Sequence, residues 1–296
     1  MGIPETQLET WAKQGSITQS STTYNHIKGT LESSSTPFAG KEFRVFLQGS
    51  YGNDTNIYAE SDVDIVIKLE AAFQQDLSSL TENEKAAFSR SYSSATYTYS
   101  DFNRDVLSTL KDAYGDDVKC GTKAITIPAG GGRRKADVIV ALEYRRYFKF
   151  SGTWDQDYVE GIVFYTSWGQ EIINYPKPHS KNLTTKHQGT DGWLKPTVRV
   201  FKNMRSKLVD KGKLQAGDAP SYYLEGLLYN VPSGKFGSSY GDTFCNAINW
   251  LAETDRTKLL CANEQYYLLR SGSHTCWEPA NCDKFLNAAS DLWRTW

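Results

Sequence analysis

The sequence has few cysteines and no long apolar segment, and these absences exclude several classes of protein. Its five cysteines are odd in number and scattered, which argues against a disulfide framework. Cys276 and Cys282 have poor spacing for a zinc site, and no set of further Cys and His ligands accompanies them. No stretch approaches the roughly 20 apolar residues of a membrane-spanning helix, and the N-terminus lacks the apolar segment of a signal peptide. We therefore expect a cytoplasmic protein without membrane contact.

An excess of charge of one sign is also lacking. The chain has 33 Lys and Arg residues against 34 Asp and Glu residues. Non-specific binding to nucleic acid depends on positive charge, so nucleic acid is not expected as a partner and any anion site must be local. With 296 residues, the chain is long enough for one large domain or two moderate ones.

Strand-like and helical patterns alternate in the first half of the chain. Apolar residues at helical spacing predict a long or broken helix over residues 5–33. Thr81 with Glu84 forms a capping-box pattern that begins a helix, and Ser100 or Asp101 begins another. A turn with a short helix is expected between the first two strands. The predicted strands are residues 43–48, 61–70, 123–128, 135–150, 161–166 and 170–175.

The second half of the chain is mostly helical in pattern. Pro196 fits only the first turn of the first of these helices. The helical segments are residues 191–212, 220–232, 238–255 and 279–296. We therefore divide the chain into residues 1–180, an N-terminal helix with a mixed α/β core, and residues 181–296, a helical C-terminal domain.

Two aspartates in an apolar run are the first sign of chemistry. In a strand, Asp62 and Asp64 would point to the same face, where two uncompensated carboxylates would repel each other. A divalent cation such as Mg²⁺ removes this repulsion and leaves room for substrate phosphates. Asp137 lies in another strand-like run. If the two strands are neighbours, three carboxylates line one edge, as in sites that hold two metal ions for phosphoryl transfer.

A Gly-Ser pair precedes the aspartates. Gly49 would let the backbone approach a phosphate closely, and Ser50 offers a hydroxyl and N–H groups to an anion. The glycine-rich segment at 130–135 is not a Walker motif, because no Gly-Lys-Ser/Thr follows it. The alternative is that Asp62 and Asp64 are surface residues of an exposed strand. The Gly-Ser pair together with a third aspartate in an apolar run favours the metal site.

These motifs resemble the bacterial cGAS/DncV-like nucleotidyltransferases (CD-NTases), and within them clade E. The family belongs to the nucleotidyltransferase superfamily that includes DNA polymerase β. The resemblance covers nearly the whole chain. It rests on "ETQLETW", "LQGSYGNDTNI", "SDVDIVI", "ADVIVALEYRRY", "NYPKPH", "KPTVRVFKNMR", "PSYYLEGLLYNVP" and "DTFCNAINWL".

The resemblance implies an α+β fold: a polymerase-β-like core with a mixed sheet, plus a helical C-terminal domain, bilobed with a central cleft. It implies that the three aspartates hold two Mg²⁺ ions, with Mn²⁺ as an alternative, and that Ser50, Lys202 and Ser221 contact the triphosphate. Taken alone, Lys202 would be a solvated lysine on a polar helix face, and Ser221 an ordinary helix N-cap.

The function that the resemblance implies is synthesis of a cyclic dinucleotide, a second messenger in bacterial anti-phage (CBASS) defence. ATP and UTP, or other nucleoside triphosphates, would be the substrates, and an effector protein activated by the cyclic nucleotide would be the partner. We expect a monomer and a pyrimidine-containing product, cyclic UMP–AMP or cyclic di-UMP.

Asn174 is the position that bears on the choice of base. Uridine-using members of the clade are similar to this chain in having Asn there, whereas purine-using relatives tend to have Ser. An amide can donate to uracil O4 and accept from uracil N3–H, but a flipped amide could also pair with adenine. A third reading is an asparagine that bonds the backbone at the end of a strand.

Three functional alternatives also stay open: a cyclic dipurine synthase, a linear nucleotidyltransferase that acts on another acceptor, and a non-enzymatic nucleotide or RNA sensor.

Overall fold

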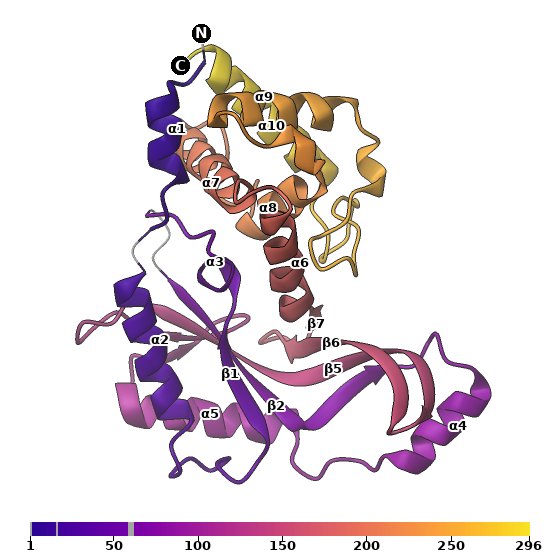
Figure 1. Cartoon of the computed structure of the whole chain (residues 1–296). Helices are drawn as coiled ribbons and strands as arrows, with labels where there is room; N and C mark the ends of the chain where they lie inside the picture. Colours follow the sequence, from indigo (N-terminus) through magenta and orange to yellow (C-terminus); the bar gives the residue numbers. More distant parts are fainter. Residues whose placement is uncertain (1, 16, 59–61) are drawn as a thin grey trace. The chain divides into compact units, whose positions relative to one another are not determined.

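The computed structural model describes residues 2–15, 17–58 and 62–296 (Figure 1). The chain packs as two compact units. The helical unit comprises Met1–Ile17, Gly49–Ser61 and Lys177–Trp296, and the sheet unit comprises Thr18–Gln48 and Asp62–Pro176. The division at residue 180 stays a prediction. The helical unit takes in two earlier segments of the chain as well as its C-terminal part.

The sheet unit is built on one mixed, seven-stranded sheet. Its strands run in the order β1-β2-β5-β4-β3, and β6 pairs with β5 and with β7. β2 and β5 are parallel, whereas β1–β2, β3–β4, β4–β5, β5–β6 and β6–β7 are antiparallel pairs. This mixed sheet confirms the predicted fold class. The strands are β1 (Phe43–Leu47), β2 (Val63–Asp76), β3 (Lys119–Cys120), β4 (Ile125–Ile127), β5 (Ala136–Gly152), β6 (Asp155–Tyr165) and β7 (Glu171–Asn174).

All six predicted strands are present, with shifted ends. β2 begins at Val63 and continues to Asp76, six residues past the predicted end; Ser61, the predicted first residue, lies outside the described residues. β5 and β6 together form a long antiparallel hairpin in Figure 1. The two-residue strand β3 was not predicted, because a pair of exposed residues carries no alternation pattern.

Local capping explains where two of the helices of the sheet unit, α4 and α5, begin. These helices are α2 (Thr18–Leu31), α4 (Glu82–Ser91) and α5 (Tyr99–Tyr114). The capping box of Thr81 and Glu84 at α4 is confirmed. The predicted start of α5 at Ser100 or Asp101 is wrong, because Thr98 is the N-cap and Asp101 is its partner in a second capping box.

The helical unit buries one large apolar core. Within this core, the ring of Phe201 packs against those of Phe244 and Phe285, with ring centroids 5.5 and 6.2 Å away. The unit contains α1 (Glu5–Ala12), α3 (Gly49–Gly52), α6 (Pro176–Gln188, whose first residue belongs to the sheet unit), α7 (Leu194–Asp210), α8 (Ser221–Asn230), α9 (Tyr240–Glu253), α10 (Pro279–Arg294) and two short 3-10 turns, Ser233–Lys235 and Arg256–Lys258.

Two sequence expectations for the helices can be compared with these bounds. The helix predicted over residues 5–33 is broken into α1 and α2, which belong to different units; Ser16 lies outside the described residues. Pro196 lies in the first turn of α7, as predicted. Helix α6 was missed, because His179 and Leu183 are its fully buried residues and its apolar periodicity is weak.

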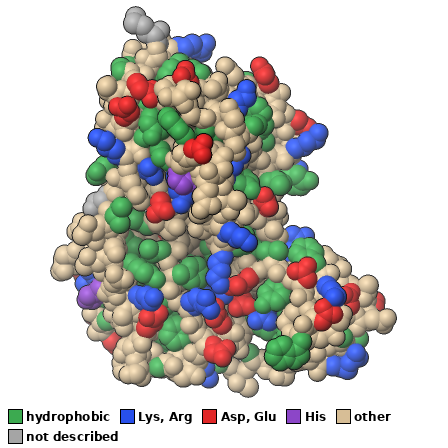
Figure 2. Space-filling model, viewed as in Figure 1, with side chains coloured by type: hydrophobic (Ala, Val, Ile, Leu, Met, Phe, Trp, Pro, Cys, Tyr) green, Lys and Arg blue, Asp and Glu red, His purple; other side chains and the backbone are tan. Residues whose placement is uncertain are grey.

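The surface carries charges of both signs. Figure 2 shows Lys and Arg side chains interspersed with Asp and Glu side chains over the face in view. In the described part of the chain, none of the helices combines the length and the apolar character needed to span a bilayer.

Candidate active site

The three candidate metal ligands lie at one end of the parallel strand pair in the sheet unit. Asp64 of β2 is the direct register partner of Asp137 of β5. Asp62 immediately precedes β2, two residues before Asp64, which is the spacing of side chains on one face of a strand. The structure therefore brings together the two strands that the sequence analysis required to be neighbours.

Lys135 shows that Asp62 and Asp137 face the same side of the sheet. Its Nζ lies 2.6 Å from Asp62 Oδ2 and 3.6 Å from Asp137 Oδ2. The hydrogen bond with Asp62, helped by the charge of both carboxylates, raises the pKa of Lys135 above its ordinary value. Thr126 of β4 donates a hydrogen bond of 2.6 Å to the other oxygen of Asp137. The carboxylates thus already attract a cation, and their oxygens are the donor type that Mg²⁺ prefers.

A second group of carboxylates lies further along the same strands. Glu70, Glu143 and Glu160 each have a carboxylate oxygen within 4.8 Å of those of the other two. Among residues 2–15, 17–58 and 62–296, this is the one group of three potential metal ligands at such distances, and Asp62, Asp64 and Asp137 do not meet the same limit. Lys68 is 1 % exposed, and its Nζ contacts all three: Glu70 at 2.9 Å, Glu143 at 3.2 Å, and Glu160 in a shorter contact. An ammonium group therefore fills the place that a metal ion would need.

Asn174 lies on the same sheet face as the aspartates. It pairs with Ile162 of β6, which pairs in turn with Glu143 of β5, and Glu143 is six residues from Asp137. Directly opposed residues share a face, as do residues an even number apart. The Asn174 Oδ1 accepts the N–H of Tyr175 at 2.8 Å, so the Nδ2 group is oriented as a donor. Asn174 can therefore bond the backbone through Oδ1 and still present Nδ2 to a base.

Gly49 and Ser50 belong to the helical unit, in the four-residue helix α3. Gly49 has φ +67°, a left-handed conformation that favours glycine. The carbonyl oxygens of both residues are held by the segment that follows: Asn53 N–H donates to Gly49 O at 3.1 Å and Thr55 N–H to Ser50 O at 2.9 Å. The Gly-Ser turn and residues 53–55 therefore form one closed loop.

Ser221 is the first residue of α8, and the N-cap is Pro220. The expectation that Ser221, taken alone, would be an ordinary N-cap is therefore wrong. Arg205 donates to Ser221 Oγ and to the carbonyl of Ala219, each at 3.1 Å. Ser221 thus lies beside a fixed positive charge, which is favourable for anion binding.

Lys202 is fully buried, with 0 % exposure, and its Nζ donates to the carbonyl of Thr55 at 2.9 Å. The reading of Lys202 as a solvated lysine is therefore wrong. The buried groups around Lys202 were not predicted from the sequence. Glu225 of α8 accepts hydrogen bonds from His179, Asn53 and Thr55 inside the helical unit. The signal available in the sequence was a glutamate at an apolar position of α8, within "YYLEGLL".

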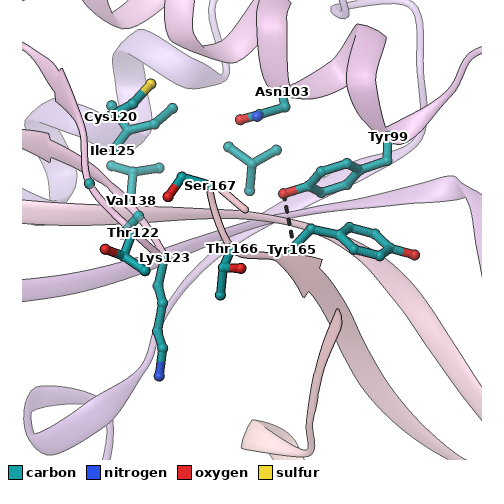
Figure 3. A pocket seen from close by; sticks show the side chains of 13 residues that line it. Tyr99, Asn103, Cys120, Thr122, Lys123, Ile125, Val138, Tyr165, Thr166 and Ser167 are labelled. Atoms are coloured by element: carbon teal, nitrogen blue, oxygen red, sulfur yellow. Dashed lines mark hydrogen bonds between the residues drawn. The ribbon is translucent and has the colours of Figure 1, made fainter. Parts of the chain in front are cut away.

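A cavity of about 280 Å³ lies on the other face of the sheet (Figure 3). Val138 and Val140 of β5 contribute to its lining, and Val138 follows Asp137 directly, so its side chain points the opposite way. Tyr99 and Asn103 of α5 also line it, and Tyr99 Oη accepts the N–H of Tyr165 at 3.4 Å. The cavity is therefore separated from the aspartates by the sheet.

Comparison with known proteins gives consistent similarities over the full chain. Residues 181–294 match the family model of the cGAS/DncV-like nucleotidyltransferase C-terminal helical domain. The chain is 41 % identical to a cyclic UMP-AMP synthase of Rhodothermus marinus, over 100 % of this chain and 99 % of that protein. It is 34 % identical to the cyclic nucleotide synthase CdnE01 of Staphylococcus haemolyticus, over the full length of both.

A solved structure agrees with these similarities. The Rhodothermus marinus CdnE c-UMP-AMP synthase, solved with Apcpp and Upnpp, superposes with a TM-score of 0.89 at 40 % identity, covering 99 % of this chain and 97 % of that one. The similarity in sequence thus extends to the three-dimensional fold.

Proposed function

Because the chain belongs to the cGAS/DncV-like nucleotidyltransferases, within the CdnE-like group, we propose that it joins ATP and UTP into cyclic UMP–AMP. The enzyme is a cyclic dinucleotide synthase, and the family implies a role in anti-phage defence. Each of two successive steps forms one phosphodiester bond and releases one pyrophosphate. The linear dinucleotide made first is closed into a ring in the second step.

The observation that carries the proposed mechanism is the pairing of Asp64 with Asp137 on adjacent parallel strands. Together with Asp62, these residues would hold two Mg²⁺ ions. When bound, the ions supply positive charge to the phosphates and lower the pKa of the attacking ribose hydroxyl. Thr126 keeps Asp137 oriented through its hydrogen bond to one carboxylate oxygen, and the other oxygen already attracts the ammonium group of Lys135 at 3.6 Å.

The triphosphate would be bound by groups of the helical unit. Ser50 and Ser221 offer hydroxyl groups, and Gly49 permits the turn that presents Ser50. Arg205 beside Ser221 supplies positive charge, and the fully buried Lys202 would add to it through its charge, since its Nζ is bonded to the Thr55 carbonyl. Charge-assisted hydrogen bonds of this kind are roughly twice as strong as those between neutral groups.

Asn174 would select the base. Its Nδ2 group is an oriented donor that matches uracil O4, while Oδ1 keeps a second lone pair for uracil N3–H. A base that left one of these groups unpaired in the closed complex would lose about 1–3 kcal/mol, or roughly 10- to 100-fold in rate. The Rhodothermus relative, 41 % identical, is a cyclic UMP-AMP synthase, and the uridine in that product supports the same choice.

The proposal is tested by incubating the full chain with Mg²⁺ and labelled ATP and UTP, followed by treatment with phosphatase. A cyclic product has no terminal phosphate and survives the treatment, whereas triphosphates and linear dinucleotides lose theirs. The variant Asp64→Asn should form no resistant product. The matched control is Asp157→Asn, an exposed aspartate on β6 of the same sheet, which should keep full activity.

Two results would overturn the proposal. Phosphatase-sensitive products alone would identify a linear transferase, and binding of triphosphates with no turnover would identify a sensor. Activity retained in Asp64→Asn would show that the metal site has been assigned to the wrong residues.

A further inference from the structure

The segment that follows the Gly-Ser turn is held by a row of buried cations on α7. Lys195, Arg199 and Lys202 lie at positions i, i+4 and i+7 and therefore share one face of the helix. Lys195 Nζ lies 2.9 Å from Asp54 Oδ2, and Arg199 Nη1 donates to the carbonyl of Asp54 at 2.5 Å. Lys202 donates to the next carbonyl, that of Thr55. Their exposures are only 7 %, 9 % and 0 %.

Glu225 balances this positive charge from α8. It is 2 % exposed and accepts hydrogen bonds from His179 Nε2 at 2.7 Å, from Asn53 Nδ2 at 3.1 Å and from Thr55 Oγ1 at short range. Burial raises the pKa of Glu225, but the hydrogen bond and charge of His179, followed by the charge of Lys202, outweigh it and hold the pKa below 4.5. A buried carboxylate with three partners is a rigid anchor.

Thr55 connects this anchor to the Gly-Ser turn. It is completely buried, its Oγ1 donates to Glu225, and its carbonyl accepts from Lys202. Its N–H donates to Ser50 O at 2.9 Å. One residue thus links two buried charges from α7 and α8 to the backbone of Ser50. All of these groups belong to the helical unit.

We infer that Thr55, fixed by Glu225 and Lys202, is a positioning residue for Ser50. The Ser50 hydroxyl must meet a phosphate oxygen at hydrogen-bond distance, so the backbone of the turn must be held in one orientation. Fixing the Ser50 carbonyl through Thr55 fixes the direction of the Ser50 side chain. This inference rests on the proposed contact between Ser50 and the triphosphate.

A double-mutant cycle tests the inference. The variants are Thr55→Val, which keeps the shape but removes the hydroxyl, Ser50→Ala, and the two combined. The measured quantity is kcat/KM for cyclic dinucleotide formation from ATP and UTP, with the thermal midpoint recorded for each. The matched control is Thr197→Val: Thr197 is also buried in the helical unit, and its hydroxyl donates to the carbonyl of Trp193, the N-cap of its own helix.

We expect Thr55→Val and Ser50→Ala each to lower kcat/KM by about 10-fold, the effect of losing one hydrogen bond to a charged group. The double variant should lose no more than about two-fold beyond Ser50→Ala, because residues that act through one another are not additive. Thr197→Val should stay within about two-fold of the wild type, and Thr55→Ser, which restores the hydroxyl, should recover activity. Glu225→Gln repeats the cycle from the other side of the hydrogen bond if Thr55→Val folds poorly.

The outcomes separate the inference from the proposed function. Losses that multiply in the double variant, or a Thr55→Val enzyme as active as Thr197→Val, would overturn the positioning role. An unaffected Ser50→Ala enzyme would instead overturn the proposed contact between Ser50 and the triphosphate.

Discussion

Replacing Lys68 by methionine should strongly destabilise the sheet unit. Lys68 is 1 % exposed and is the shared partner of Glu70, Glu143 and Glu160, whose oxygens lie within 4.8 Å of one another. Methionine fills similar volume without the charge. The variant would therefore leave three carboxylates facing each other, with Glu143 only 6 % exposed.

The loss of stability expected for Lys68→Met depends on how far the three glutamates are exposed to water. Removing one partner of a buried ion pair costs about 3–5 kcal/mol because the remaining charge is uncompensated. Glu70 and Glu160 have side chains that are 21 % and 32 % exposed, so water relieves part of the repulsion. Glu143 also keeps its ion pair with Arg145 at 2.6 Å. We therefore expect the lower end of the range, about 3 kcal/mol.

Urea unfolding at neutral pH measures this loss as a lower midpoint with an unchanged m-value. The control is Lys149→Met, which breaks an exposed pair with Asp155, with side chains 53 % and 59 % exposed, and should cost less than about 1 kcal/mol. A Lys68→Met variant as stable as this control would refute the reasoning.

The difference in stability between the wild type and Lys68→Met should depend on pH. Burial raises the pKa of Glu70, but its hydrogen bond to Lys68 and the charge of Lys68 outweigh it and hold the pKa below 4.5. A carboxylate with a depressed pKa stabilises the fold above its unfolded pKa, and this contribution is lost as the pH falls through the folded value. The difference between the wild type and Lys68→Met should therefore shrink below pH 4.5, and a constant difference would contradict this assignment.

Two further predictions concern the active site. Asn174→Ser should shift incorporation from uridine towards purines by about 10- to 100-fold, measured as the base ratio in the product; an unchanged ratio would exclude Asn174 as the selecting residue. Lys135→Met should tighten Mn²⁺ binding by roughly five-fold in a calorimetric titration, because removing one largely hydrated charge near Asp62 and Asp137 is worth about 1 kcal/mol. Equal or weaker binding would show that Lys135 does not compete with the cation.

The strands of the site were predictable because apolar residues along a short segment mark a buried strand. Asp62, Asp64 and Asp137 each lie next to or within an apolar run, and such runs predict buried strands without any alignment. The sequence alone did not show that the two strands are neighbours. The metal site depended on that pairing, and in the structure β2 and β5 are parallel neighbours with Asp64 opposite Asp137. The capping box at Thr81 was predictable because both of its residues, Thr81 and Glu84, lie within three positions of each other in the sequence.

The surroundings of the site were not predictable, because they join residues far apart in the sequence. Thr55 and Glu225 are 170 positions apart, and Lys68 and Glu160 are 92 apart. Neither pair leaves a periodic pattern in one chain. Lys202 illustrates the consequence: its helix and its charge were visible in the sequence, but its complete burial against Thr55 was not.

Mass spectrometry of the product made from all four ribonucleoside triphosphates with Mg²⁺ tests the central claim most directly. We predict a phosphatase-resistant dinucleotide that contains uridine, with cyclic UMP–AMP as the main species. Only dipurine products, or no resistant dinucleotide at all, would contradict this account.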